Sequence, residues 1–230
     1  LHGLGCFPGE DKSSLGMLGM HGNYEANLAM NKCDLMINVG ARFDDRVTGR
    51  LDAFSPDSVK FHIDIDQSSI NKNVKVDFHT NTDITMTLKE INSFIESNNI
   101  ELEKKDYTNW WGQINDWRKK ECLHYEQGEE IIKPQHAISR LYDLTTQKDT
   151  FITTEVGQHQ MWAAQYYKFS KPNRWITSGG LGTMGFGMPA AVGAQMANPD
   201  SLVIDIAGEA SFLMNIQEIA TAVQYLSLIH

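Results

Sequence analysis

The sequence has little cysteine, no excess of basic charge and no long apolar run. No stretch approaches the roughly 18 consecutive apolar residues of a membrane-spanning helix, so we expect no membrane span. Leu1–Glu10 has neither the basic start nor the apolar stretch of a secretory signal. Acidic side chains (29) outnumber basic ones (20), for a net charge of −9. This balance argues against nucleic acid as the main partner, because binding to phosphates needs a basic surface.

The three cysteines, Cys6, Cys33 and Cys122, lie far apart and form neither a metal-type pair nor an even disulfide set. We therefore expect a reducing, cytoplasmic environment. The 230 residues are 41% hydrophobic and 21% charged, a globular composition with enough apolar material for a core. This length suits one large domain or two small ones.

Short apolar runs alternate with helical patterns along the chain. Strands are predicted at Leu35–Val39, Val59–Ile65, Phe151–Thr154, Arg174–Thr177 and Leu202–Ile206, and helices from Asp83, over Tyr107–Tyr125, from Lys133, and over His159–Tyr167, Met184–Met196 and Asn215–Tyr225. The continuous apolar run Leu35–Val39 predicts a strand buried on both faces. Strands that alternate with helices predict an α/β fold with doubly wound parallel sheets.

Polar loops near the first two strands are candidate ligand sites. Gly40–Val47 brings two arginines and two aspartates to the carboxyl end of a strand, where ligands bind in open α/β sheets. Guanidinium groups there suit a phosphate or a carboxylate; the alternative is a surface ion-pair loop. The glycines of Leu18–Gly22 allow close approach to a ligand, or form a plain loop. Asp64 stands where nucleotide folds carry a sugar-binding acid, or is a polar strand end.

Two motifs in the second half of the chain carry glycine. Gly180–Gly185 matches a dinucleotide fingerprint, with Asp205 at the spacing of a ribose-binding acid. We reject a nicotinamide domain, because Asp205 falls inside an apolar strand and Gly187 and Pro189 interrupt the following helix. Gly208–Phe212 follows a buried strand with a carboxylate and a hydroxyl, which suits a divalent cation that bridges a diphosphate, or a simple helix start.

Together these segments resemble a known family, the acetolactate (acetohydroxyacid) synthase large catalytic subunits. The resemblance rests on Leu18–Gly22, Val39–Gly49, Val156–Gln165 and Ser178–Gln195, and runs from near Leu4 to about Tyr225. Arg42–Arg46 and Gln158–Trp162 are specific to this synthase among thiamine-diphosphate enzymes. The resemblance implies a transferase of branched-chain amino-acid biosynthesis, which condenses two pyruvates, or pyruvate and 2-oxobutyrate, with loss of CO2.

The resemblance also implies two incomplete doubly wound parallel-sheet domains. Residues 1–100 would be the C-terminal half of a central FAD-binding domain, 101–133 a linker with a helix, and 134–230 the N-terminal half of a diphosphate-binding domain. The positions that match FAD contacts are Met20, His21, Gly40, Arg42, Asp44, Arg46, Val47, Asp64, Ile65 and Asp83. Met20 and Arg46 also match positions beside the substrate, where Arg46 would bind the carboxylate of the second 2-oxoacid. The FAD is structural in this family.

The same resemblance assigns the thiamine-diphosphate site. The matching positions are Val156, Gly157, Gln158, His159, Gly182, Met184, Gly208, Ala210 and Ser211. Glu209 stands where the family has an aspartate on Mg2+; it keeps the charge but is one methylene longer, so we expect a poorer fit to octahedral geometry. Leu226–His230 departs from the family pattern.

The family implies a homodimer with a regulatory subunit and small 2-oxoacid substrates. We expect the chain to be a piece of such a subunit and inactive by itself. Two alternatives remain: another thiamine-diphosphate decarboxylase or carboligase, and a non-catalytic nucleotide-binding module.

Overall fold

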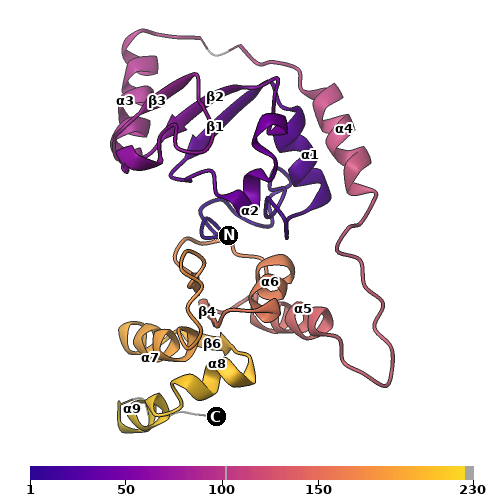
Figure 1. Ribbon diagram of the computed structural model, residues 1–230, viewed down its shortest axis with the longest axis vertical. Helices are drawn as coiled ribbons and strands as arrows, with labels where there is room; N and C mark the ends of the chain where they lie inside the picture. Colours follow the sequence, from indigo (N-terminus) through magenta and orange to yellow (C-terminus); the bar gives the residue numbers. More distant parts are fainter. Residues whose placement is uncertain (102, 226–230) are drawn as a thin grey trace. The chain divides into compact units, whose positions relative to one another are not determined.

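The computed structural model describes residues 1–101 and 103–225, and its chain divides into two compact units (Figure 1). We call Leu18–Cys122 the central unit. The C-terminal unit combines Leu1–Met17 with Leu123–His230. The domain bounds expected from the resemblance stay a prediction, and the expectation for Leu226–His230 lies outside the described residues.

The central unit is built on a parallel sheet in the order β1-β2-β3. Its elements are α1 (Tyr24–Lys32), β1 (Leu35–Val39), α2 (Asp45–Thr48), η1 (Leu51–Ala53), β2 (Val59–Ile63), η2 (Gln67–Ser69), β3 (Phe78–Thr80), α3 (Ile84–Ser97) and α4 (Thr108–Arg118). Asp83 caps α3, because its side chain accepts hydrogen bonds from the backbone N–H groups of Thr85 and Met86. The parallel sheet and a helix that starts at Asp83 confirm two predictions from the sequence.

The prediction that Leu35–Val39 is buried on both faces is wrong. Leu35, Ile37 and Val39 are 53%, 59% and 48% exposed, so one face of β1 is open in the central unit. On the other face, Met36 packs with Met30 of α1 around a core of buried residues that includes Phe43. The error arises because an apolar run predicts a strand, whereas its burial depends on which helices cover each face. Helix α4 runs alongside α1 (Figure 1).

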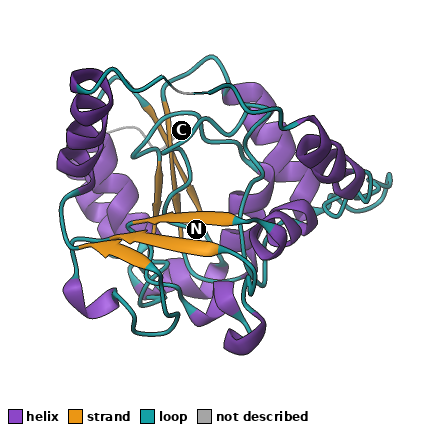
Figure 2. Cartoon of the chain, turned by 90° about the horizontal axis from the view of Figure 1, so that it is seen from above, coloured by secondary structure: helices purple, strands orange, loops and turns teal. Residues whose placement is uncertain are grey.

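The C-terminal unit has a second parallel sheet, in the order β5-β4-β6. Its elements are α5 (Pro134–Thr145), β4 (Thr150–Thr154), α6 (Gln158–Tyr166), β5 (Trp175–Thr177), α7 (Gly187–Ala197), β6 (Leu202–Ile206), α8 (Glu209–Met214) and α9 (Glu218–Tyr225). Helices flank the strands in both units (Figure 2). Helix α7 contacts β4 and β6, as does α6, and α5 packs on α6.

The core of the C-terminal unit lies between β4 and the pair α5 and α6. Ile152 is fully buried there with Ile138, Ala163 and Trp175. The N-terminal segment adds Met17 to this core, and the Gly9 N–H donates to the Phe169 carbonyl at 2.9 Å. The predicted doubly wound arrangement is thus present around this sheet.

Three predicted helices differ in their bounds. The helix expected over Tyr107–Tyr125 ends at Arg118, and the one expected from Met184 begins at Gly187, after Gly185 with a φ of +83°. The last helix, expected over Asn215–Tyr225, begins at Glu218 as α9, and Asn215 is the C-cap of the preceding short helix α8. None of the helices among residues 1–101 and 103–225 is long and apolar enough to cross a membrane.

Candidate functional site

Three loops meet at the carboxyl edge of the β5-β4-β6 sheet, where the sequence predicts a diphosphate site. They follow β4 (from Glu155), β5 (from Ser178) and β6 (from Ala207). A Cβ built on Gly182 would lie 3.8 Å from the Val156 Cγ1, which joins the β5 and β4 loops. A Cβ on Gly208 would lie 3.2 Å from the His159 Cε1, which joins the β6 and β4 loops. The structure therefore brings these predicted residues together.

His159, in the first turn of α6, occupies the centre of this cluster. Its imidazole lies against Gly157 as well as Gly208, and its Nε2 is buried with no hydrogen-bond partner among the described residues. Burial lowers the pKa of His159, while a hydrogen bond with the Glu155 backbone and the charges of Glu155 and Glu209 oppose that shift. The imidazole is thus held largely neutral, with one nitrogen available to a ligand.

The loop after β5 is held at both ends. The backbone N–H of Thr183 donates to the Ser178 hydroxyl at 3.0 Å, and the Asn215 side-chain amide donates to the Gly185 carbonyl at 2.5 Å. Gly182 and Met184 are exposed between these anchors, with Met184 43% exposed. The sequence analysis did not single out Asn215 as a site residue. The sequence indicates only an amide side chain at the start of a predicted helix.

The start of α6 and the residues around α8 fit a diphosphate with a bound cation. The N-cap of α6, Gly157, has no side chain to satisfy the first-turn N–H groups, which favours an anion there. Glu209 and Ala210 are exposed, whereas Ser211 is 2% exposed. Among the residues that the structure describes, no group of three or more His, Cys, Asp or Glu side chains is arranged to hold a metal ion. One carboxylate suffices for Mg2+ only where diphosphate oxygens and water complete the octahedron.

In the central unit, Met20 and Arg46 meet through their backbones. The Met20 N–H donates to the Arg46 carbonyl at 2.8 Å, and Gly19 before it has a φ of +94°. Met20 is 64% exposed and Arg46 is exposed. The backbones of the two residues expected beside the substrate are thus held next to each other.

The Gly40–Val47 loop is organised by Asp44. Its carboxylate caps α2 by accepting the Arg46 N–H at 3.0 Å and pairs with the Arg42 guanidinium. The pKa of Asp44 is held below its ordinary value chiefly by the hydrogen bond from the Arg46 backbone. The Asp45 side chain and the charge of Arg42 add to this effect. The Gly40 N–H donates to the Ile63 carbonyl at 2.8 Å, so the loop begins at the carboxyl edge of the sheet.

Two acids expected to contact FAD have their carboxylates occupied within the chain. Asp64 is 8% exposed; one oxygen accepts the Asp66 N–H at 2.8 Å, and the other lies 3.3 Å from the Nε2 of buried His62, without hydrogen-bond geometry. Asp83 caps α3. Of the other residues expected to contact FAD, Arg42, Arg46, His21, Gly40 and Ile65 are exposed.

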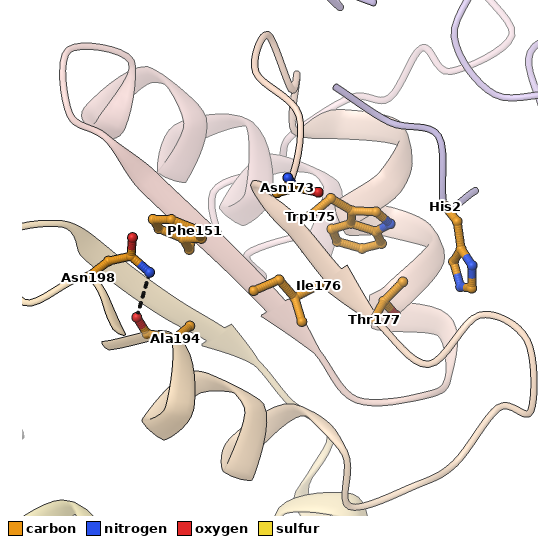
Figure 3. A pocket seen from close by; sticks show the side chains of 8 residues that line it. All are labelled: His2, Phe151, Asn173, Trp175, Ile176, Thr177, Ala194 and Asn198. Atoms are coloured by element: carbon orange, nitrogen blue, oxygen red, sulfur yellow. Dashed lines mark hydrogen bonds between the residues drawn. The ribbon is translucent and has the colours of Figure 1, made fainter. Parts of the chain in front are cut away.

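A pocket of about 460 Å³ lies beside β5 (Figure 3). It is lined by His2, Phe151, Asn173, Trp175, Ile176, Thr177, Ala194 and Asn198. None of the predicted cofactor residues is among them, so the pocket does not coincide with the candidate site. The dashed line in Figure 3 joins the Asn198 amide to the Ala194 carbonyl, at 3.0 Å.

Comparisons with known proteins agree with this geometry. Residues 1–91 match the family model "Thiamine pyrophosphate enzyme, central domain", and residues 155–230 match "Thiamine pyrophosphate enzyme, C-terminal TPP binding domain". The second range contains all three loops of the cluster.

The chain is also similar to named synthases. It is 48% identical over 225 residues to the acetolactate synthase isozyme 3 large subunit of Escherichia coli, a match that covers 98% of this chain and 39% of that protein. It is 44% identical to the acetolactate synthase large subunit of Haemophilus influenzae (98% and 39%), and 49% identical to acetolactate synthase 1, chloroplastic, of Nicotiana tabacum (96% and 33%). The chain thus spans about two fifths or less of the length of these relatives. With two matching domain models and these identities, the chain belongs to the thiamine pyrophosphate enzymes.

Proposed function

We propose that this chain carries part of the active site of an acetolactate synthase catalytic subunit. The reaction joins two pyruvates, or pyruvate and 2-oxobutyrate, with loss of CO2, in branched-chain amino-acid biosynthesis. The observation that carries the proposal is the meeting of the three loops around Val156, His159, Gly182 and Gly208. The similarity to three named synthases supports this reaction over others of the family.

Thiamine diphosphate would lie across these loops, and when bound it supplies the electron sink for decarboxylation and carbon–carbon bond formation. The first turn of α6 and the backbone near Gly208 would bind its diphosphate, with Mg2+ on Glu209. Gly182 leaves room for its aminopyrimidine ring, and Met184 would support it from below. The neutral His159 would offer its unpaired Nε2 on the same side.

Residues of the central unit would bind the second substrate and FAD. Arg46 suits the carboxylate of the second 2-oxoacid, because a guanidinium binds a carboxylate through two parallel hydrogen bonds. Met20 would contact the same substrate, since its backbone is bonded to that of Arg46. FAD would bind as a structural cofactor along Arg42, Arg46 and Ile65. We further propose a homodimer with a regulatory subunit in the cytoplasm, a compartment that suits three cysteines without a disulfide.

Calorimetric titration with thiamine diphosphate and Mg2+ tests the cofactor site. We expect binding by the chain, and at least a tenfold loss in Gly208→Val, because even the first added carbon would lie 3.2 Å from the His159 Cε1. Gly193→Ala is the matched control: a Cβ there meets nothing within 4 Å, so binding should be unchanged. Equal affinity in both variants would contradict a site at these loops.

The reaction itself is tested by replacing the matched segment of the Escherichia coli subunit with this chain. Acetolactate formed from pyruvate by the loaded chimera supports the proposal. Release of acetaldehyde in its place would favour the decarboxylase alternative. Bound flavin without binding of thiamine diphosphate would favour the nucleotide-binding module.

A further inference from the structure

Two carboxyl groups lie under the start of α7, each with one buried oxygen that has no hydrogen-bond partner among the described residues. Glu155 directly follows β4 and is fully buried. Asp205 lies in β6, where its register partner on β4 is Thr153. Because side chains alternate along a strand, Thr153, Glu155 and Asp205 share the sheet face that α7 covers.

Each carboxyl group has one oxygen bonded and one without a partner. The Met188 N–H donates to the Glu155 Oε1 at 3.2 Å, and the Thr153 hydroxyl donates to the Asp205 Oδ1 at 2.8 Å. The Glu155 Oε2 and the Asp205 Oδ2 are buried with no hydrogen-bond partner among the described residues. A buried charged oxygen without a partner is unfavourable, whereas a protonated oxygen donates a hydrogen bond.

Helix α7 begins directly against the two groups. A Cβ built on Gly187 would lie 2.5 Å from the Asp205 Oδ1 and 2.8 Å from the Glu155 backbone nitrogen, so this position accepts no side chain. The N-cap of α7 offers no side-chain hydrogen bond, and the carboxylate of Glu155 serves its Met188 N–H instead. A negative charge there is also stabilised by the helix dipole.

The charged groups near the pair come from α6 and α8, and none comes from α7. Helix α7 has no titratable side chain among Gly187–Ala197. His159 of α6 interacts with Glu155, and Glu209 of α8 interacts with His159. Burial, together with the charge of Glu155, raises the pKa of Asp205 to about 6, and the Thr153 hydrogen bond opposes this shift.

We propose that Glu155 and Asp205 are positioning residues that jointly take up one proton in weakly acidic solution and thereby fix the start of α7. The pair adjoins two loops of the candidate site and sets the position of both. Glu155 directly precedes Val156–His159, and α7 continues the loop that contains Gly182 and Met184. The effect on cofactor binding rests on the proposed function, whereas the joint titration does not.

Carbon-13 NMR of the side-chain carboxyl groups in the labelled chain tests the joint titration. We expect two separated midpoints, the upper one near pH 6, because coupled acids titrate in two steps. Glu155→Gln should move the Asp205 midpoint to lower pH, and Asp205→Asn provides the reciprocal test if the first variant does not fold. Two midpoints below pH 5, or an Asp205 midpoint unmoved by Glu155→Gln, would overturn the proposal.

The positioning role is tested by the affinity for thiamine diphosphate at pH 5.5 and pH 8. Dividing the wild-type Kd by the Kd of Glu155→Gln cancels the titration of the cofactor itself. This ratio should rise at least threefold from pH 5.5 to pH 8. Glu155→Ala should weaken binding about tenfold, and Glu155→Gln should rescue it, since glutamine keeps an acceptor for the Met188 N–H. Asp149→Asn, at the opposite edge of the same sheet, is the control: the ratio of the wild-type Kd to the Kd of this variant should be the same at both pH values.

These outcomes separate the two proposals. A ratio that does not change with pH would overturn the positioning role. Absence of binding in the wild-type chain would count against the proposed function, and the NMR titration would still decide the inference about the pair.

Discussion

The Met20 N–H donates to the carbonyl of Arg46 at 2.8 Å, joining two residues that lie far apart in the sequence and were both predicted to face a substrate. Gly19 permits this contact, because its φ is +94° and a Cβ there would lie 2.3 Å from the Arg46 oxygen. A side chain at this position must push the two loops apart.

We therefore predict that Gly19→Ala destabilises the central unit by about 2 kcal/mol, the sum of left-handed strain and steric overlap. Urea unfolding followed by fluorescence of Trp110, Trp111 and Trp117, which lie in that unit, measures the loss. Gly40→Ala is the control, because Gly40 has a φ of +61° but nothing within 4 Å of a built Cβ. Equal losses in both variants would show that strain alone acts and that the contact does not matter.

Asp149 anchors the amino-terminal edge of the second sheet. Both of its oxygens accept from Arg174 at 3.0 Å, and Lys171 and Ser201 add hydrogen bonds. The Arg174 guanidinium, with these donors, lowers the pKa of Asp149 to about 2. Because the folded value is below the unfolded one, this carboxylate stabilises the fold above pH 4, and the contribution is lost as the pH falls from about 4 to 2.

We predict that Asp149→Asn lowers the stability at pH 7 by about 1 kcal/mol, a value reduced for solvent screening because the side chain is 37% exposed. Thermal unfolding at pH 7 should show a Tm lower by about 3 °C. The difference from the wild type should shrink as the pH approaches 2. A difference that is constant with pH would mean that packing of Arg174 on Phe151, and not the charge, stabilises this edge.

Strand positions were predictable where local sequence decides them. Leu202–Ile206 and Leu35–Val39 have the predicted bounds, since each is an apolar run flanked by residues that end strands. The exposure of Ile37 was not predictable, because it depends on which helices pack on the sheet. The start of α7 was predicted three residues too early, because the positive φ of Gly185 (+83°) extends the loop beyond Met184.

The candidate site was predictable in its location and less so in its contacts. Ligand loops at the carboxyl edge follow from parallel strands, and this placed His159 and Gly208 together. The burial of Asp64 was not predictable, although its contacts are local: the Asp66 N–H and the buried His62 lie two residues away on either side. Asn215 and Glu155 were missed because each acts on a segment remote in sequence.

A row of hydroxyl and amide groups ties β4, β5 and α6 together below the site. The Thr154 and Thr177 hydroxyls lie 2.8 Å apart, and the Gln160 amide donates to the Thr177 hydroxyl at 2.6 Å. Thr177→Val keeps the shape but leaves Thr154 and Gln160 without this partner, so we predict a loss of about 2 kcal/mol in urea unfolding. Thr177→Ser retains the hydroxyl and should lose less than half as much. A valine variant as stable as the serine variant would show that these bonds contribute little.

Glu209 provides the last test, because its carboxylate is exposed at the start of α8 and it belongs to no group of three or more potential metal ligands within the described residues. Mg2+ requires near-ideal octahedral geometry, and the shorter aspartate side chain holds its carboxylate closer to the backbone that would bind the diphosphate. We predict that Glu209→Asp lowers the Kd for thiamine diphosphate about fivefold at saturating Mg2+, with little change when the metal is removed by a chelator. Glu218→Asp, an equivalent change in the first turn of α9, controls for the general effect of shortening an acid. Equal affinity of the wild type and Glu209→Asp would show that glutamate serves as the ligand equally well, and a gain that persists in chelator would show that Glu209 acts without the metal.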